Sequence, residues 1–360
     1  MVQAQKMLVY AFLSLFLVSF FPTNGRCRGL LEKDRPDHVA KTIETEYGDI
    51  YDCIDFYKQP AFNHPLLKNH SFHPETRSSS TPKVVVDNNA NSWSKNEMSL
   101  LDMFRFKDGG CPSGTVPIRR LSNYHTNWKY PEQDVSGIVF ALGQTKNDPS
   151  KKYYGARGEI SVWNPQLLKP NQYTSAEIIL RGGNDAIIAG WTAGDQHCFD
   201  SECGFVVTRP DIPLNLVMSP LSKIPGPIYA NSFFVYQDEK NGNYYLQGGK
   251  DNIELGFWPK DIFVGLANGA TYAGCGGEVY TEGTVKPIDA PVMGAGTYPD
   301  ELPEKTNFAY CKFQVVDDAH NIVTTPYLEE FTNNKEYNAV VTNQENAKFI
   351  YFGGPFPVNV

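Results

Sequence analysis

The feature that most limits how this chain can fold is a series of short apolar segments separated by turn-forming residues, which runs from Tyr153 onward. The segments "ARGEISVW", "SAEIILRGG", "AIIAGW" and "GFVVTR" have the length and the residue types of β-strands. In "SFFVYQDEKNGNYYLQ", two aromatic runs flank Asn241-Gly242, a pair that accommodates the positive φ angles of a tight hairpin turn. Strands at such regular spacing, with few helical patterns, predict an all-β protein built as an antiparallel β-sandwich.

The N-terminal part of the chain has a different character. Prolines interrupt it, as in "KQPAFNHPLLKNH", and it contains the polar, Ser-rich segment "PETRSSSTPK", which is typical of a surface loop. A chain of 360 residues is also long enough for more than one domain. We therefore expect a small domain over residues 28–149 to precede a β-sandwich over residues 150–360.

The first 27 residues predict a secretory signal peptide. Lys6 precedes the apolar run "MLVYAFLSLFLVSFF", and the helix-breaking "PTNG" follows it. The run is short for a membrane span, so a membrane anchor is the weaker alternative. No later apolar stretch approaches the length of a membrane-spanning helix. We therefore expect a secreted chain with no membrane association once residues 1–27 are removed.

Secretion makes the cysteines interpretable as disulfides. The chain has seven cysteines, so at least one has no partner within the chain. Cleavage directly after Cys27 would remove the odd one, whereas cleavage after Gly25 would leave a free thiol. The favoured pairs are Cys198–Cys203 within the short segment "CFDSEC", Cys53–Cys111, and Cys275–Cys311, with two buried free thiols as the alternative for the last pair.

Charge and histidine content limit the classes of partner. The net charge of −8 argues against nucleic acid, because no strongly basic face is available to neutralise phosphates. His64, His70 and His73 lie close together in "NHPLLKNHSFHP", but without Cys partners or a helical His pair they indicate a Pro-bounded surface segment rather than a metal site. We expect neither a metal nor a cofactor. The sequon "NHS" at Asn69 predicts N-glycosylation of the same exposed segment.

Several segments, taken in order, resemble the neprosin family of secreted plant proteins. "YDCIDFYKQPAFNHPLLKNH" and "GCPSGTVPIRR" resemble the N-terminal activation segment of that family. "YYGARGEISVWNP", "IIAGW", "IPLNLVMSPLS", "FFVYQDEKNGNYYLQ", "LGFWPKDIF", "GGEVY" and "FGGP" follow in family order and cover most of the chain after the signal. The resemblance implies a precursor with an inhibitory N-terminal domain and a jelly-roll-like sandwich related to the glutamic peptidases.

The resemblance also implies a reaction and the residues that perform it. Active members of the family are acid endopeptidases that cut after proline and use two glutamates, one of which belongs to a motif ending in "GGE" and is retained here as Glu278. The other belongs to a motif Ile-Glu-Ala-Gly-Trp, where this chain has Ile188 in place of the glutamate. Hydrolysis by paired carboxyls needs one ionised group and one protonated group, and isoleucine provides neither. Loss of one member costs about 4 kcal/mol or more of barrier.

A substitute carboxyl is the alternative that the sequence leaves open. In an extended "DAIIAGW", Asp185 lies on the face opposite to Ile188, so it points away from the expected site. Glu159 and Glu177 lie on neighbouring predicted strands, and either is a candidate. We expect Ile188 itself to be a buried strand residue facing Glu278, which would leave that carboxyl neutral and unpaired. Only "TAGDQH" separates "AGW" from Cys198, which predicts a shortened wall of the cleft.

Three functions are consistent with the sequence. The first is a secreted, non-catalytic or weakly active relative of the glutamic endopeptidases, which binds proline-containing peptides or a wall protein and acts outside the cell, in the cell wall or in the vacuole. The second is an active acid endopeptidase that cuts after proline and uses Glu278 with a substitute carboxyl. The third is a carbohydrate-binding wall protein. The missing carboxylate at Ile188 favours the first, and whether the chain is an enzyme stays open.

Overall fold

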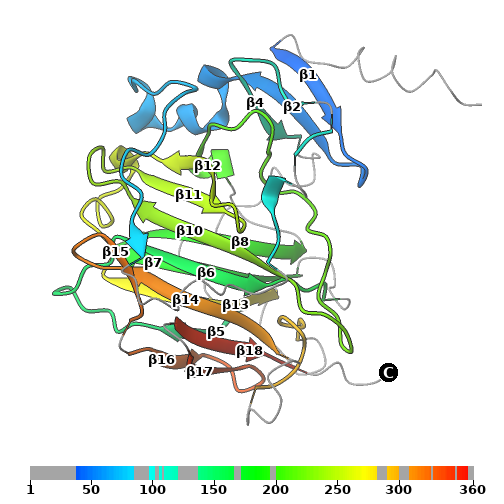
Figure 1. Ribbon diagram of the computed structural model, residues 1–360, viewed down its shortest axis with the longest axis vertical. Helices are drawn as coiled ribbons and strands as arrows, with labels where there is room; N and C mark the ends of the chain where they lie inside the picture. Colours follow the sequence, from blue (N-terminus) through cyan, green and yellow to red (C-terminus); the bar gives the residue numbers. More distant parts are fainter. Residues whose placement is uncertain are drawn as a thin grey trace, which may run out of the picture. The chain divides into compact units, whose positions relative to one another are not determined.

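The structure is a computed structural model, which describes residues 38–84, 97–101, 105–107, 109–120, 137–165, 172–194, 200–281, 290–299, 308–325, 327–344 and 347–355. Its larger sheet has the strand order β17-β18-β14-β6-β10-β11-β12-β9, with β15 paired to β14 and β3 paired to β15. Strands β14, β6, β10, β11 and β12 of this sheet are labelled in Figure 1. The strands of this sheet are β3 (Lys83–Val84), β6 (Gly155–Ser161), β9 (Val206–Val207), β10 (Ala230–Gln237), β11 (Tyr244–Gly248), β12 (Ile253–Trp258), β14 (Ala309–Val316), β15 (Asn321–Val323), β17 (Asn338–Gln344) and β18 (Ala347–Gly353).

A second, five-stranded sheet has the order β16-β5-β13-β7-β8, and all its pairs are antiparallel. Its strands are β5 (Ile138–Gln144), β7 (Gln172–Gly182), β8 (Asp185–Gly194), β13 (Tyr272–Thr281) and β16 (Glu329–Thr332). The long strands β7 and β13 pair over ten residues at the centre of the sheet. Strand β5 precedes residue 150, yet it lies beside β13, so the five-stranded sheet draws on both sides of that position.

The core lies between the two sheets, and strand alternation explains which residues fill it. On β7, Ala176, Ile178 and Leu180 belong to the main hydrophobic core, whereas their odd-numbered neighbours point away from it. On β6 of the larger sheet, Ala156 and Ile160 face the same core. The prediction of an all-β sandwich is therefore confirmed. Five short 3₁₀ turns lie within the described residues: η1 (Phe56–Lys58), η2 (Pro60–Asn63), η3 (Pro65–Leu67), η4 (Asp200–Cys203) and η5 (Lys260–Ile262). Leu100 and Leu101 are α-helical.

Disulfides join elements that are distant in sequence. Cys275 on β13 is bonded to Cys311 on β14, so a buried covalent link connects the two sheets through the core. Cys53 is bonded to Cys111, and these are the two pairings that the sequence favoured for these four cysteines. Cys203 is also disulfide-bonded, whereas Cys198 lies outside the described residues.

The N-terminal region forms a three-stranded antiparallel sheet from β1 (Val39–Glu44), β2 (Ile50–Asp55) and β4 (Thr115–Arg119). The Tyr51 hydroxyl donates to the backbone carbonyl of Leu214, and the Cys111 N–H donates to that of Pro210, so this sheet is attached to the β-sandwich. Within the described part of the chain, no helix is long and apolar enough to cross a membrane. The predicted signal peptide, residues 1–27, lies outside the described residues.

Candidate functional site

The retained glutamate lies on the face of the five-stranded sheet that points away from the core. Glu278 on β13 pairs directly with Ser175 on β7. Two residues along β7, Glu177 pairs with Gly276 on one side and with Gly190 of β8 on the other. Directly paired residues, and residues two apart on one strand, share a face of the sheet. The register therefore places Glu278, Ser175 and Glu177 together on this outer face.

Glu177 and Glu278 form a hydrogen-bonded pair of carboxyls, which we call the carboxyl pair. Their relative exposures are only 6% and 7%, so bulk water screens neither group. The Tyr173 hydroxyl donates a short hydrogen bond to Glu278 Oε1, and the Ser175 hydroxyl donates to Glu177 Oε2 at 3.0 Å. Glu177 Oε1 is buried and has no hydrogen-bond partner among the described N–H and hydroxyl groups.

Both carboxyls of the pair bind a proton more tightly than an exposed glutamate does. Burial raises the pKa of Glu177 well above its usual value, and the adjacent charge of Glu278 raises it further. Burial also raises the pKa of Glu278, but hydrogen bonds from Tyr173 and from Glu177 oppose that rise. Two adjacent carboxyls do not readily ionise together, so the pair holds a single proton over a range of pH. Such a pair provides a general base and a general acid at the same time.

Ile188 does not lie where we expected it. It pairs with Ile179, two positions along β8 from the Gly190 that pairs with Glu177, and its side chain is 40% exposed. The expectation of a buried strand residue was therefore wrong: the core-facing residues of β8 are Ile187, Ala189 and Trp191. The expectation that Glu278 would be an unpaired acid was wrong as well, because Glu177 occupies the neighbouring position.

The other candidate carboxyls are used elsewhere. Asp185 Oδ2 accepts hydrogen bonds from the N–H groups of Val264 and Gly265, so it caps a loop rather than entering the site. Glu159 lies on β6 in the larger sheet and accepts a hydrogen bond from the Tyr310 hydroxyl. Of the three substitutes considered from the sequence, Glu177 is the one that the fold brings to Glu278. The sequence did contain a signal for this position. In the strand "SAEIIL", side chains alternate between the two faces, so Glu177 lies on the face opposite to Ala176 and Ile178.

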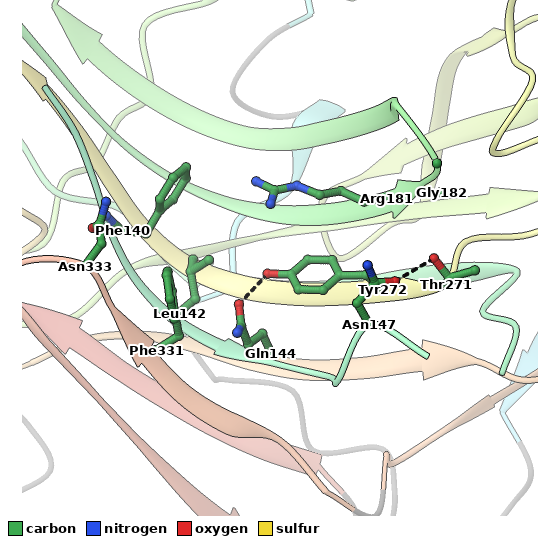
Figure 2. A pocket seen from close by; sticks show the side chains of 11 residues that line it. Phe140, Leu142, Gln144, Asn147, Arg181, Gly182, Thr271, Tyr272, Phe331 and Asn333 are labelled. Carbon is green, nitrogen blue, oxygen red and sulfur yellow. Dashed lines mark hydrogen bonds between the residues drawn. The ribbon is translucent and has the colours of Figure 1, made fainter. Parts of the chain in front are cut away.

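A pocket on the same face of the sheet escaped the sequence analysis. It is a cavity of about 380 Å³ that contains one charged side chain, Arg181, at the end of β7 (Figure 2). The guanidinium of Arg181 lies 5.8 Å from the ring centre of Phe140 and 5.3 Å from that of Tyr272. We call this cavity the Arg181 pocket; its other lining residues are Leu142, Gln144, Asn147, Gly182, Gly183, Thr271, Phe331 and Asn333. The sequence did not predict this pocket, because a single arginine at the end of a strand, such as Arg181, is not a motif.

The N-terminal histidines do not converge on one point. His70 is stacked between Phe62, at 3.7 Å between ring centres, and Phe72, at 5.5 Å, and burial lowers its pKa. No group of three or more His, Cys, Asp or Glu side chains arranged to hold a metal occurs among the described residues. Asn69, the predicted glycosylation site, is exposed.

Comparison with protein families matches both parts of this architecture. The Neprosin family model matches residues 172–355, which include β7, β8, β13 and therefore both members of the carboxyl pair. The model of the Neprosin activation peptide matches residues 42–126, which include β2 and β4 of the N-terminal sheet.

Proposed function

Because this chain belongs to the neprosin family, we propose that it hydrolyses peptide bonds at mildly acidic pH with Glu177 and Glu278 as its two carboxyls. The observation that carries the proposal is the buried, hydrogen-bonded carboxyl pair. Glu177 takes over the role that a glutamate at the position of Ile188 performs in the relatives, from the adjacent strand and on the same face of the sheet.

We assign the proton of the singly protonated pair to Glu177, because burial and the charge of Glu278 both raise its pKa. Glu278, ionised and held by the Tyr173 hydroxyl, removes a proton from a water molecule, whose oxygen attacks the carbonyl carbon of the substrate. Glu177, which holds the proton of the pair, donates it to the nitrogen of the scissile peptide bond as the C–N bond breaks. The proton taken up by Glu278 then restores the singly protonated pair.

The pH range of this reaction follows from the two raised pKa values. Activity needs the form with one proton, and it is lost at low pH when both carboxyls are protonated and at high pH when both are ionised. Burial raises both pKa values, so the active range is displaced upward from the usual glutamate value of 4.5. We propose proline-containing peptides or wall proteins as substrates. Disulfides fit an extracellular protein, and we place the activity in the cell wall or the vacuole.

A second candidate is a protein that binds peptides without cleaving them. Ile188 favours it, because this exposed apolar side chain stands on the face of the carboxyl pair where the relatives have a glutamate. This candidate predicts peptide retention by the unmodified chain and cleavage only after Ile188→Glu.

The test compares the full chain with three variants on a proline-rich peptide between about pH 3 and pH 7. We expect cleavage by the unmodified chain, with loss of about 100-fold or more in Glu278→Gln and in Glu177→Gln. Glu239→Gln, which makes the same change at an exposed residue beyond β10, is the matched control. Equal activity of Glu177→Gln and the control would refute the role of Glu177, and peptide retention without cleavage by the unmodified chain would support the binding function.

A further inference from the structure

The Arg181 pocket and the carboxyl pair lie on one continuous face of the five-stranded sheet. Phe140, which lines the pocket, pairs directly with Glu278, and Leu142, another lining residue, pairs with Gly276. Gly276 in turn pairs with Glu177. Residues of the pocket wall are therefore direct cross-strand neighbours of the catalytic region that we propose.

Arg181 extends from the end of β7 along this face toward the carboxyl pair. Its guanidinium reaches Phe140, the residue paired with Glu278, as Figure 2 shows. On β13, the positions between Tyr272 and Glu278 on this face are Gly274 and Gly276, which have no side chains to obstruct it. The guanidinium is close enough to lower the pKa of both Glu177 and Glu278.

The polar groups around Arg181 are already occupied. The Tyr272 hydroxyl donates to Gln144 Oε1 at 2.8 Å, and the Thr271 hydroxyl donates to Asn147 Oδ1 at 2.9 Å. Asn333 accepts from the Phe140 N–H. Arg181 makes no ion pair with any residue that the structure describes, and its side chain is exposed to the cavity. The pocket thus presents a cation whose hydrogen-bond donors are open to a ligand.

We propose that the Arg181 pocket binds the acidic side chain of a substrate residue next to the scissile bond. The inference rests on the proposed function, because it assigns a substrate class to the same site. A guanidinium forms two parallel hydrogen bonds with a carboxylate, and its contacts with the rings of Phe140 and Tyr272 hold it in place before the ligand arrives. A cavity of about 380 Å³ has room for a glutamate side chain.

The protonation states of ligand and site are compatible. An aspartate or glutamate side chain of a flexible peptide ionises with a pKa of about 4. Burial raises the pKa of both members of the carboxyl pair, so the singly protonated pair persists at pH values where the ligand carboxylate is ionised. The preference for an acidic residue should therefore be measurable within the active pH range. It should decrease at lower pH, where the carboxylate of the ligand becomes protonated.

The test uses peptides that differ in a single residue, Glu or Gln, placed in turn at each position on either side of a proline. All have amidated C-termini, and a further Gln peptide has a free C-terminal carboxylate. We expect kcat/KM for the best Glu peptide to exceed that of its Gln counterpart by about tenfold or more, as for a charged hydrogen bond. Arg181→Gln should abolish this ratio, Arg181→Lys should keep part of it, and the exposed control Lys240→Gln should leave it unchanged.

A binding measurement separates this inference from the proposed function. Fluorescence anisotropy of the same labelled peptides with the Glu278→Gln variant reports recognition without hydrolysis. A Glu preference in binding that disappears with Arg181→Gln supports the pocket even if the unmodified chain cleaves nothing. Cleavage or binding without any Glu preference overturns the inference, as does a Glu preference that survives Arg181→Gln. The inference would also be overturned if only the Gln peptide with a free C-terminal carboxylate bound more tightly. The pocket would then bind the C-terminus of a peptide and not an acidic side chain.

Discussion

Replacing Glu177 by glutamine should change how the stability of the folded protein depends on pH. Glu177 is buried beside Glu278, and its pKa is raised well above the usual value of 4.5. In the unfolded chain the same side chain ionises near its usual pKa. A raised pKa in the folded state contributes stability that is fully present below about pH 4.5 and is lost as the pH rises toward the folded value, because the unfolded chain releases its proton first.

The slope of this loss does not depend on the size of the shift. Between the two pKa values the folded state holds one proton more than the unfolded state, so the free energy of unfolding falls by about 1.4 kcal/mol per pH unit. The glutamine side chain of Glu177→Gln would not titrate, and its amide can still donate a hydrogen bond to Glu278. The free energy of unfolding of the variant should therefore fall less steeply with rising pH, by about 1.4 kcal/mol per pH unit, than that of the unmodified chain. Near neutral pH the variant should be the more stable of the two.

Urea unfolding of the oxidised protein, followed by tryptophan fluorescence at half-unit pH steps, measures this difference. Glu239→Gln removes a carboxylate that is exposed, so its profile should run parallel to that of the unmodified chain. Parallel profiles for Glu177→Gln and the unmodified chain would refute the reasoning, because they would mean that Glu177 titrates in the folded protein as it does in the unfolded chain.

Three further changes test other parts of the structure. Tyr173→Phe removes the hydroxyl that donates to Glu278, so the pKa of Glu278 should rise and the acid limb of the kcat/KM profile should move to higher pH; an unmoved limb would contradict the role of Tyr173. Ile188→Glu adds an exposed carboxylate on the face of the carboxyl pair, and we expect it to change an activity that the unmodified chain already has. Cleavage assays on the unmodified chain and on the variant test this, and cleavage by the variant alone would contradict it. The double change Cys275→Ala and Cys311→Ala removes the buried link between the sheets and should lower the unfolding free energy by about 2–4 kcal/mol in urea titrations, whereas an unchanged midpoint would show that packing alone holds the sheets.

The all-β class could be predicted from local pattern, because strand alternation and turn residues are encoded over a few neighbouring positions. The hairpin around Asn241-Gly242 is an example: β10 and β11 pair on either side of it. The extent of the sandwich could not be predicted in the same way. Strand β5 lies before residue 150 but pairs with residues of β13 that are 130 to 142 positions further along the chain, and such a pairing has no local signature.

For the candidate site, too, some properties follow from the sequence and others only from the tertiary structure. By its own alternation the sequence determined that Glu177 and Arg181 lie on the face of β7 opposite to Ile178, and the order of motifs identified Glu278 and the substitution at Ile188. Only the tertiary structure decided that Glu177 meets Glu278, because this depends on the register between β7 and β13. A slip of two residues would keep every side chain on its face and yet move the two carboxyls apart by about 7 Å. Register is set by the packing of whole strands, so the presence of a carboxyl pair is a property of the folded sheet.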